Sequence, residues 1–393
     1  MLSKIKSLSE SVFPYAVDCY RYLHANPELS FQEFETSLFV QNQLTEIGIP
    51  FRAEIGGTGI LGKIQGKNPA KRVIALRADM DALPIQEQVE LPWKSKNANV
   101  MHACGHDAHT ACLLAAAKIL NSLRNEFEGT ILLVFQPGEE RSPGGANLML
   151  KDGVFDELEP EIIIGQHVSE DYPTGSMAFR SGSIMASADE IHVSIRGRGG
   201  HGAKPHLIND TVLAAAQTLV SLQQVKSRLC PPLTPMVLSF GKLIADGTTN
   251  VIPNEVQMSG TFRTYDEIWR KQAKAHIRRI ITETCAAYGC NAEIDMPEGY
   301  PFLKNDEEIT RQAKKFATEL VGAENVLEFD QRLTSEDFAF FSQRYPACFY
   351  RFGIKGESNA DMGRSHTPTF RIDEEALLTG TSELAWLVWK FLQ

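Results

Sequence analysis

The sequence is short of positive charge. Its 393 residues include 39 lysines and arginines against 49 aspartates and glutamates, which gives a formal net charge of −10 at pH 7. Nucleic acids and anionic membrane surfaces attract clustered positive charge, and the chain has no basic run that would supply it. We therefore expect neither a nucleic acid nor a membrane to be its partner.

Long apolar runs and a regular cysteine framework are also missing. Residues 1–10 contain no apolar core of signal-peptide length, and no uncharged apolar run in the sequence is long enough to span a bilayer. The seven cysteines are an odd number at irregular spacings, which suits a reducing compartment. We expect a cytoplasmic protein, and its 43% hydrophobic and 22% charged residues are ordinary for globular domains.

What the chain does contain is an alternation of helical and strand patterns. Apolar residues at helical spacing predict helices, and short apolar runs predict the strands of a mixed sheet. The expected helices span residues 8–23, 34–46, 111–120, 307–321 and 373–391, and the expected strands span 60–65, 73–76, 130–135, 161–168 and 347–352. Residues 334–338 are expected to start a further helix. The fold class is therefore α/β.

The pattern changes in the middle of the chain. Residues 190–196, 209–225, 236–243, 255–264, 266–288 and 291–296 predict the order β-α-β-β-α-β, which is the ferredoxin-like arrangement. We expect a mixed-sheet α/β domain formed by residues 1–186 and 300–393, with a ferredoxin-like domain inserted at 187–299.

Metal-binding side chains are unusually dense at residues 102–109. This stretch holds one thiol, three imidazoles and a carboxylate. Asp107 is expected to be the N-cap of the following helix, so Cys104 and His106 would lie in a tight loop where the helix N-terminus favours a thiolate. The alternative is a buried cysteine beside solvent-exposed histidines.

Further candidates follow three successive predicted strands, each at its carboxyl end. They are Asp79 and Asp81, the pair Glu139–Glu140, and His167. Acids after strands are often only turn residues, but in open α/β sheets this edge is where sites form. One of two adjacent glutamates can ligate a metal while the other handles protons. Together with the Cys/His loop, the three strand ends favour one metal crevice.

The inserted domain opens with a glycine-rich loop at residues 197–202 that matches GxGxxG, the dinucleotide fingerprint. A proline follows at position 205 and would prevent a helix from starting there, so we reject a dinucleotide site. The glycines can instead bring His201 close to a substrate. Asn250 and Arg263 are candidates for binding a substrate carboxylate, although each could equally be a turn former or a surface charge.

Taken together, the motifs resemble one known family. They stand at residues 77–84 (RADMDALP), 101–109 (MHACGHDAH), 136–140 (QPGEE), 165–168 (GQHV), 199–206 (GGHGAKPH), 335–338 (SEDF) and 365–370 (SHTPTF). This set is similar to the dinuclear-metal amidohydrolases of the aminoacylase and carboxypeptidase family. It most resembles the branch of hippurate hydrolases, N-acyl-amino-acid amidohydrolases and auxin-conjugate hydrolases.

The resemblance implies a role for each candidate. By position, the metal ligands are Cys104, His106, Glu140, His167 and His366. The general base is Glu139, the residue that orients a ligand is Asp81, and the residue that stabilises the oxyanion is His201. His102 and His109 are supporting residues at most. In the wider family a histidine stands where this chain has Asp79.

The resemblance also implies an activity and a cofactor. It implies hydrolysis of the amide bond of small N-acyl amino acids with two divalent metal ions, zinc before manganese, nickel or cobalt. A homodimer would form through the inserted domain, with His201 reaching the partner's site. The alternatives are a dipeptidase or carboxypeptidase activity at the same site, another dinuclear hydrolase such as a phosphoesterase, and a non-catalytic metal-binding protein.

Overall fold

The computed structural model describes residues 1–357 and 359–393 and divides the chain into two compact units. The first unit comprises Met1–Ile184, Lys304–Gln331 and Glu336–Gln393, and the second comprises Met185–Leu303 and Arg332–Ser335. The divisions lie a few residues from the expected ones at 186/187 and 299/300, and the second unit also takes the short segment 332–335.

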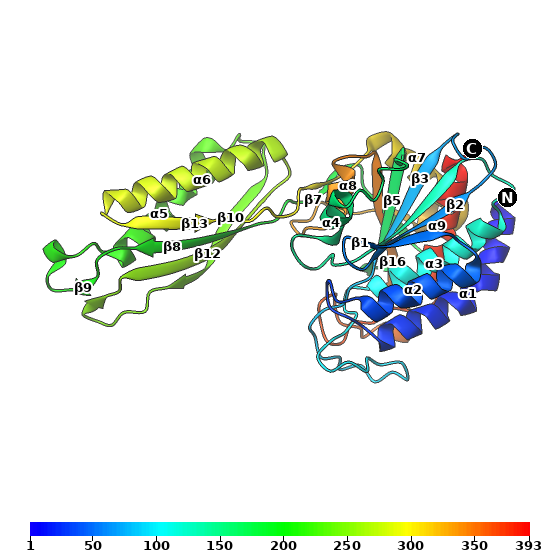
Figure 1. Cartoon of the computed structure of the whole chain (residues 1–393), viewed down its shortest axis with the longest axis horizontal. Coiled ribbons are helices and arrows are strands. Elements are labelled where there is room, and N and C mark those ends of the chain that lie inside the picture. The colour runs from blue at the N-terminus through cyan, green and yellow to red at the C-terminus, as the bar shows by residue number, and fades with distance from the viewer. The chain divides into compact units, whose positions relative to one another are not determined.

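A mixed sheet forms the centre of the first unit (Figure 1). Within the described residues it has eight strands in the order β1-β2-β4-β3-β5-β16-β6-β15. Their bounds are β1 Phe51–Ile55, β2 Gly59–Gln65, β3 Val73–Asp79, β4 Thr130–Gln136, β5 Ile162–Pro173, β6 Met177–Phe179, β15 Val326–Glu328 and β16 Ala347–Lys355. The central strands β4, β3, β5 and β16 run parallel. Every residue of β3 and β4 is buried, as expected for parallel strands covered on both faces.

Helices supply the rest of the apolar core of this unit. Helices α1, α2, α3, α7 and α9 pack their apolar side chains with those of the sheet in one cluster, and Figure 1 shows α1, α2 and α3 side by side. The shorter helices α4 and α8 contact β4 and β16. The bounds are α1 Leu2–Ala25, α2 Phe34–Ile47, α3 His106–Ser122, α4 Gly145–Lys151, α7 Glu307–Val321, α8 Ala339–Ser342 and α9 Ala376–Phe391.

The second unit is a four-stranded antiparallel sheet in its described residues, in the order β10-β12-β8-β13, with α5 and α6 on one face (Figure 1). Its bounds are β8 Asp189–Arg196, α5 Thr211–Gln224, β10 Met236–Ile244, β12 Glu255–Thr264, α6 Glu267–Ala287 and β13 Asn291–Asp295. Asp210 and Asp266 cap α5 and α6 with their carboxylates. The expected ferredoxin-like arrangement is confirmed.

Short strands complete the structure. They are β7 Gly182–Met185, which pairs with β14 Leu303–Asn305, and β9 Gly200–His201, which pairs with β11 Val251–Ile252. No helix in the described part of the chain is both long and apolar enough to cross a membrane.

Several expected element bounds differ from those in the structure. Helix α1 begins at Leu2 instead of residue 8, and α3 begins at His106 instead of residue 111. Strand β5 continues to Pro173 instead of ending near residue 168, because β16 pairs with it as far as Lys355. The helix expected to start within residues 334–338 has its N-cap there, at Phe338, and its first residue is Ala339 of α8. The acidic side chains of that segment are drawn into a buried network with Arg77.

Candidate metal centre

The register of the central parallel strands places the candidate residues at the same height along the sheet, near its carboxyl edge. In the parallel ladder between β3 and β5, Arg77 lies opposite Gly165, and between β3 and β4, Asp79 lies opposite Gln136. His167 follows Gly165 by two residues, so it stands level with Asp79. Strands β3 and β4 end here, and the chain leaves them at the edge where α/β sheets form their sites.

A glycine allows the Cys/His loop to approach this edge. Gly105 is the N-cap of α3 with φ of 83°, and a Cβ atom there would lie 2.5 Å from Val168 Cγ2. Only glycine fits such a position without strain. Cys104 and His106, on either side of it, are therefore held against β5.

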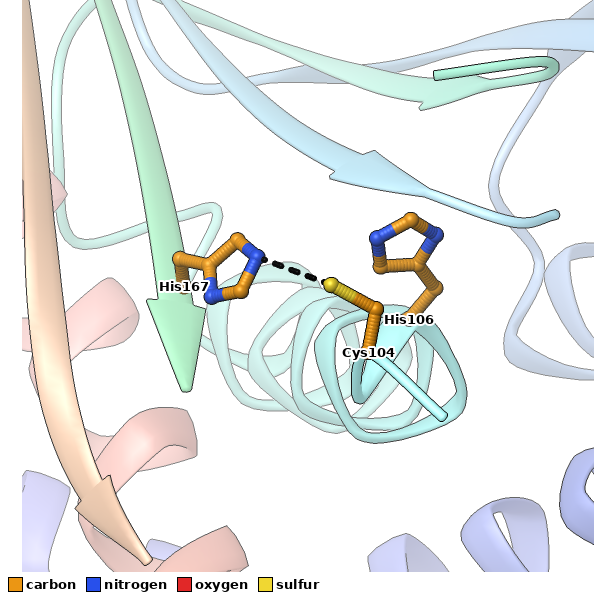
Figure 2. Close-up of side chains that lie close together, drawn as sticks. All are labelled: Cys104, His106 and His167. Carbon is orange, nitrogen blue, oxygen red and sulfur yellow. Dashed lines mark hydrogen bonds between the residues drawn. The ribbon is translucent and has the colours of Figure 1, made fainter. Parts of the chain in front are cut away.

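The first group of donor atoms comes from Cys104, His106 and His167, drawn in Figure 2. Cys104 Sγ lies 3.5 Å from His167 Nε2. The Nδ1 atoms of the two rings donate to backbone carbonyls, that of His167 to Val168 at 2.7 Å and that of His106 to Asp81 at 2.9 Å. These bonds leave Nε2 of each ring to face the thiol.

The second group comes from Cys104, Glu140 and His366, so the two groups share the thiol. His366 Nε2 lies 3.0 Å from Glu140 Oε1. The loop of His366 is fixed from the other side, because its backbone N–H donates to the carbonyl of Ala103 at 2.8 Å. His366 has φ of 64°, which is uncommon for a residue other than glycine and is maintained by these contacts.

This donor set fits a metal centre. In each group the donor atoms lie within 4.8 Å of one another, and thiol, imidazole and carboxylate are ligands that zinc and other late first-row metals accept. The Nε2 atom of His106 is fully buried, yet no described residue forms a hydrogen bond with it. A buried polar atom without a partner is costly unless it binds an ion or a water.

Burial and hydrogen bonds shift the pKa values of these donors. The pKa of the Cys104 thiol is raised, first by burial and then by Glu140. In the metal-free site, burial and the charge of Glu140 thus oppose the thiolate that the helix N-terminus is expected to favour. The pKa of His366 is raised to about 10 by its hydrogen bonds with Cys104 and Glu140. Metal binding must then displace protons from both groups.

Glu139 lies next to the donor groups and is buried. Its side-chain oxygen, together with those of Glu336 and Asp337, forms a compact acidic group, and Oε1 accepts a hydrogen bond from the backbone N–H of Asp337 at 3.3 Å. Burial, followed by the negative charges of Glu336 and Glu140, raises the pKa of Glu139 well above its usual range.

Asp81 connects these parts. Its carboxylate accepts hydrogen bonds from the backbone N–H groups of Glu139 and Glu140, both at 3.0 Å, and from the hydroxyl of Ser30 at 2.6 Å. The same carboxylate lies 3.1 Å from His106 Nδ1. It therefore fixes one imidazole and the backbone of two glutamates at once, a geometry that suits the orienting role expected of it.

The expectation that Asp107 is the N-cap is wrong. Gly105 takes that position, and Asp107 is the second residue of α3. Its carboxylate accepts from His24 Nδ1 at 2.7 Å, while His24 Nε2 lies 3.2 Å from Glu87 Oε1. His24 is thus a buried partner of two acids.

Sequence reasoning missed the buried network of Arg77. Its guanidinium donates to Asp79, to Gln136 at 2.8 Å, and to Glu336 and Asp337 at 2.9 Å each. The available signal was a charged residue inside a strand of otherwise apolar, fully buried character.

Asp79 of this network also accepts a hydrogen bond from His109 Nδ1 at 2.6 Å. The other ring nitrogen of His109, Nε2, accepts from the Val168 amide at 2.9 Å. Both ring nitrogens of His109 are thus occupied within the protein.

The remaining candidates lie in the second unit and not in the cluster of the first. His201 stands in β9 with an exposed side chain, and its Nδ1 accepts from the Ala203 amide at 3.1 Å. Asn250 is exposed and contacts Thr248. Arg263 is half-buried in β12 and donates to the Ser335 hydroxyl at 3.2 Å.

The chain is similar to known hydrolases over nearly its whole length. Residues 75–390 match Peptidase family M20/M25/M40. IAA-amino acid hydrolase ILR1-like 2 of Arabidopsis thaliana is 39% identical over 389 residues, covering 98% of this chain and 87% of that protein. N-acetyl-L-cysteine deacetylase of Bacillus subtilis is 38% identical over 358 residues, covering 91% and 83%.

A solved structure agrees with these sequence matches. The YxeP protein of Bacillus subtilis, described as a dinuclear metal-binding peptidase of the M20 family, is 34% identical and superposes with a TM-score of 0.83 over 98% of this chain and 99% of its own. The resemblance seen in the sequence motifs is confirmed. The chain belongs to peptidase family M20/M25/M40, and it is a metal-dependent hydrolase of amide bonds.

Proposed function

We propose that the protein hydrolyses N-acyl amino acids, with N-acetyl, N-benzoyl or similar acyl groups, to a carboxylic acid and a free amino acid. The observation that carries this proposal is the buried carboxyl of Glu139 beside two donor groups that share Cys104. The two relatives above carry names for amide hydrolysis of acylated amino acids, and this supports the same substrate class here.

In this proposal the metal ligands are Cys104, His106, Glu140, His167 and His366. Two overlapping donor groups suit a pair of divalent ions, for which zinc is the first choice and manganese, nickel and cobalt are alternatives. Bound metal would make a water nucleophilic at neutral pH and polarise the scissile carbonyl. Asp81 orients His106 through its contacts at Nδ1.

Glu139 is the general base and acid. It would accept the proton of the attacking water and then pass it to the leaving amine. The backbone N–H of Asp337 donates to Oε1 of Glu139, and this contact supports a fixed carboxyl orientation for both proton transfers. Burial also keeps bulk water from exchanging with the transferred proton.

The second unit supplies substrate contacts in this proposal. His201 stabilises the oxyanion, and Asn250 and Arg263 bind the substrate carboxylate.

We propose a homodimer through this unit, with His201 acting in the partner's site. The exposed edge strand β10 and exposed Leu243 and Ile244 on it support pairing with a second copy. The buried thiols, which form no disulfide among the described residues, suit the proposed cytoplasmic location.

The test is a substrate panel on purified protein of measured metal content. N-acetyl and N-benzoyl amino acids should release free amino groups, a chelator should abolish this, and zinc should restore it. Faster cleavage of dipeptides would instead favour a peptidase, and cleavage of a phosphate monoester would favour a phosphoesterase. Metal retention with no turnover of any substrate would support a non-catalytic metal-binding protein and overturn the proposal.

A further inference from the structure

Three successive backbone N–H groups in the turn after β4 all donate to buried carboxylates. Those of Glu139 and Glu140 donate to Asp81, and that of Gly138 donates to Glu33 Oε1 at 2.8 Å. The backbone of the turn that carries the two glutamates is therefore held by carboxylates from two separate segments.

Glu33 is itself firmly placed. Its side chain is fully buried, and its second oxygen accepts a hydrogen bond from the Thr58 hydroxyl at 2.8 Å. Its first oxygen also accepts from the backbone N–H of Phe31 at 2.9 Å. Glu33 precedes α2 at the N-cap position, but its side chain makes no capping hydrogen bond to that helix. The carboxylate thus accepts a hydrogen bond from the turn at Gly138 and none from the N-terminus of the helix.

The residues just before Glu33 contact the same turn. A Cβ atom on Gly138 would lie 2.2 Å from the Phe31 ring, and Gly138 has φ of 55°, so the ring lies directly against a backbone position that favours glycine. The hydroxyl of Ser30 donates to Asp81, which holds the next two amides. Residues 30–33 therefore contact every amide of the turn, directly or through Asp81.

We propose that Glu33 is a positioning residue for the Glu139–Glu140 turn, acting with Phe31 and Ser30 as a clamp formed by residues 30–33. The clamp fixes the backbone so that Glu139 faces Glu336 and Asp337 while Glu140 faces Cys104 and His366. The inference rests on the proposed roles of the two glutamates.

Three variants test the clamp. Glu33→Ala removes the acceptor of the Gly138 amide, Glu33→Gln keeps an acceptor oxygen of the same shape, and Thr58→Val removes only the hydroxyl that holds Glu33. Glu35→Ala is the matched control, because Glu35 lies in the first turn of α2 and is exposed. Metal content is measured on every sample before assay.

The first readout is hydrogen exchange of the peptide that contains residues 137–140, in the metal-loaded protein without substrate. We expect faster exchange there in Glu33→Ala, a smaller increase in Thr58→Val, and the wild-type rate in Glu33→Gln and Glu35→Ala. Faster exchange spread equally over α2 would assign Glu33 a merely structural role. This readout needs no turnover, so it stands even if N-acyl amino acids are not the substrates.

The second readout is steady-state kinetics on the best substrate of the wild-type panel. Misplacing a catalytic group by about 1 Å can cost about 100-fold, so kcat of Glu33→Ala should fall by up to that factor with KM within a few-fold. Glu33→Gln should recover most of the rate. The clamp is refuted if kcat of a folded, metal-loaded Glu33→Ala equals that of Glu35→Ala, or if Glu33→Gln is as slow as Glu33→Ala.

Discussion

The two units place their candidate residues in opposite surroundings. In the first unit the ligand and base candidates are mostly buried and contact residues that come from five or more separate segments of the chain. In the second unit His201 and Asn250 are exposed, and the hydrogen bonds of their side chains join residues two positions apart. The first set is fixed by the fold, whereas the second is free to contact something outside its own unit.

This difference indicates a division of labour. A reacting centre gains from groups held in one geometry, and burial strengthens each electrostatic interaction within it. Groups that bind a substrate and then release it can be exposed, with side-chain hydrogen bonds only to residues nearby in the sequence. We therefore expect substitutions in the first unit to affect metal binding, chemistry or folding, and those in the second to affect reaction with substrate while leaving stability unchanged.

The largest expected effect is on chemistry in the first unit. Glu139→Gln should retain both metal ions and lower kcat by about 10²- to 10⁴-fold, because general acid–base catalysis contributes on that order. Metal analysis and steady-state rates on the same sample measure both quantities. Cys104→Ala is the matched variant, since it should lose metal as well as activity. A fully active Glu139→Gln enzyme would remove Glu139 from the mechanism.

The next effect is on folding of the first unit. Arg77→Met removes the cation shared by Asp79, Glu336 and Asp337, all buried. Breaking a buried ion pair from one side costs about 3–5 kcal/mol, because the remaining charges are left uncompensated. Urea unfolding followed by tryptophan fluorescence measures the loss.

The second unit offers the control for this prediction. Arg196→Met breaks pairs with Glu255 and Glu293 on the exposed face of the small sheet. Its midpoint of unfolding should match that of the wild-type protein, since exposed ion pairs contribute little. Equal losses in the two variants would mean that burial of the Arg77 network does not matter.

The Arg77 network also shows where sequence reasoning stops. Local patterns predicted residues 255–264 as a strand and 307–321 as a helix, and the structure has β12 and α7 with these bounds. Periodicity reports which face of an element is buried. It does not report which distant side chain arrives there, and Arg77 and Glu336 are 259 positions apart.

The same limit explains the errors near the donor groups. Asp107 has the residue type and local position of an N-cap, but His24, 83 positions earlier, draws its carboxylate away. The pattern at residues 334–338 places the helix start slightly too early for the same local reason. The ligand candidates themselves could be named from the sequence because motif residues carry their own chemistry, whereas the residues that orient them are defined only by contacts across the fold.

An intermediate effect is expected from His201 in the second unit. His201→Ala should lower kcat by about 10²- to 10³-fold, the loss seen when one oxyanion donor is removed, with an unchanged midpoint of unfolding because the side chain is exposed. Co-expression with Glu139→Gln separates action in cis from action in trans. If His201 serves the partner's site, mixed dimers contain one intact site and about a quarter of wild-type activity returns. No recovery in verified mixed dimers would assign His201 to its own subunit.

The smallest expected effect is on the pH dependence of the free energy of unfolding of the first unit, to which His24 contributes. Burial lowers the pKa of His24, but Asp107 and Glu87 outweigh it and raise the value to about 9, above the ordinary 6.5. A raised folded-state pKa gives stability that is complete below about pH 6.5 and is lost as pH rises through about 9. The shift corresponds to about 3 kcal/mol.

The free energies of unfolding of wild type and His24→Gln should therefore differ most near pH 6, and the difference should shrink by about that amount near pH 10. The control is His192→Gln, which replaces a partly exposed histidine beside Glu190 in the second unit. A difference between wild type and His24→Gln that stays constant across this range would show that His24 contributes by packing alone.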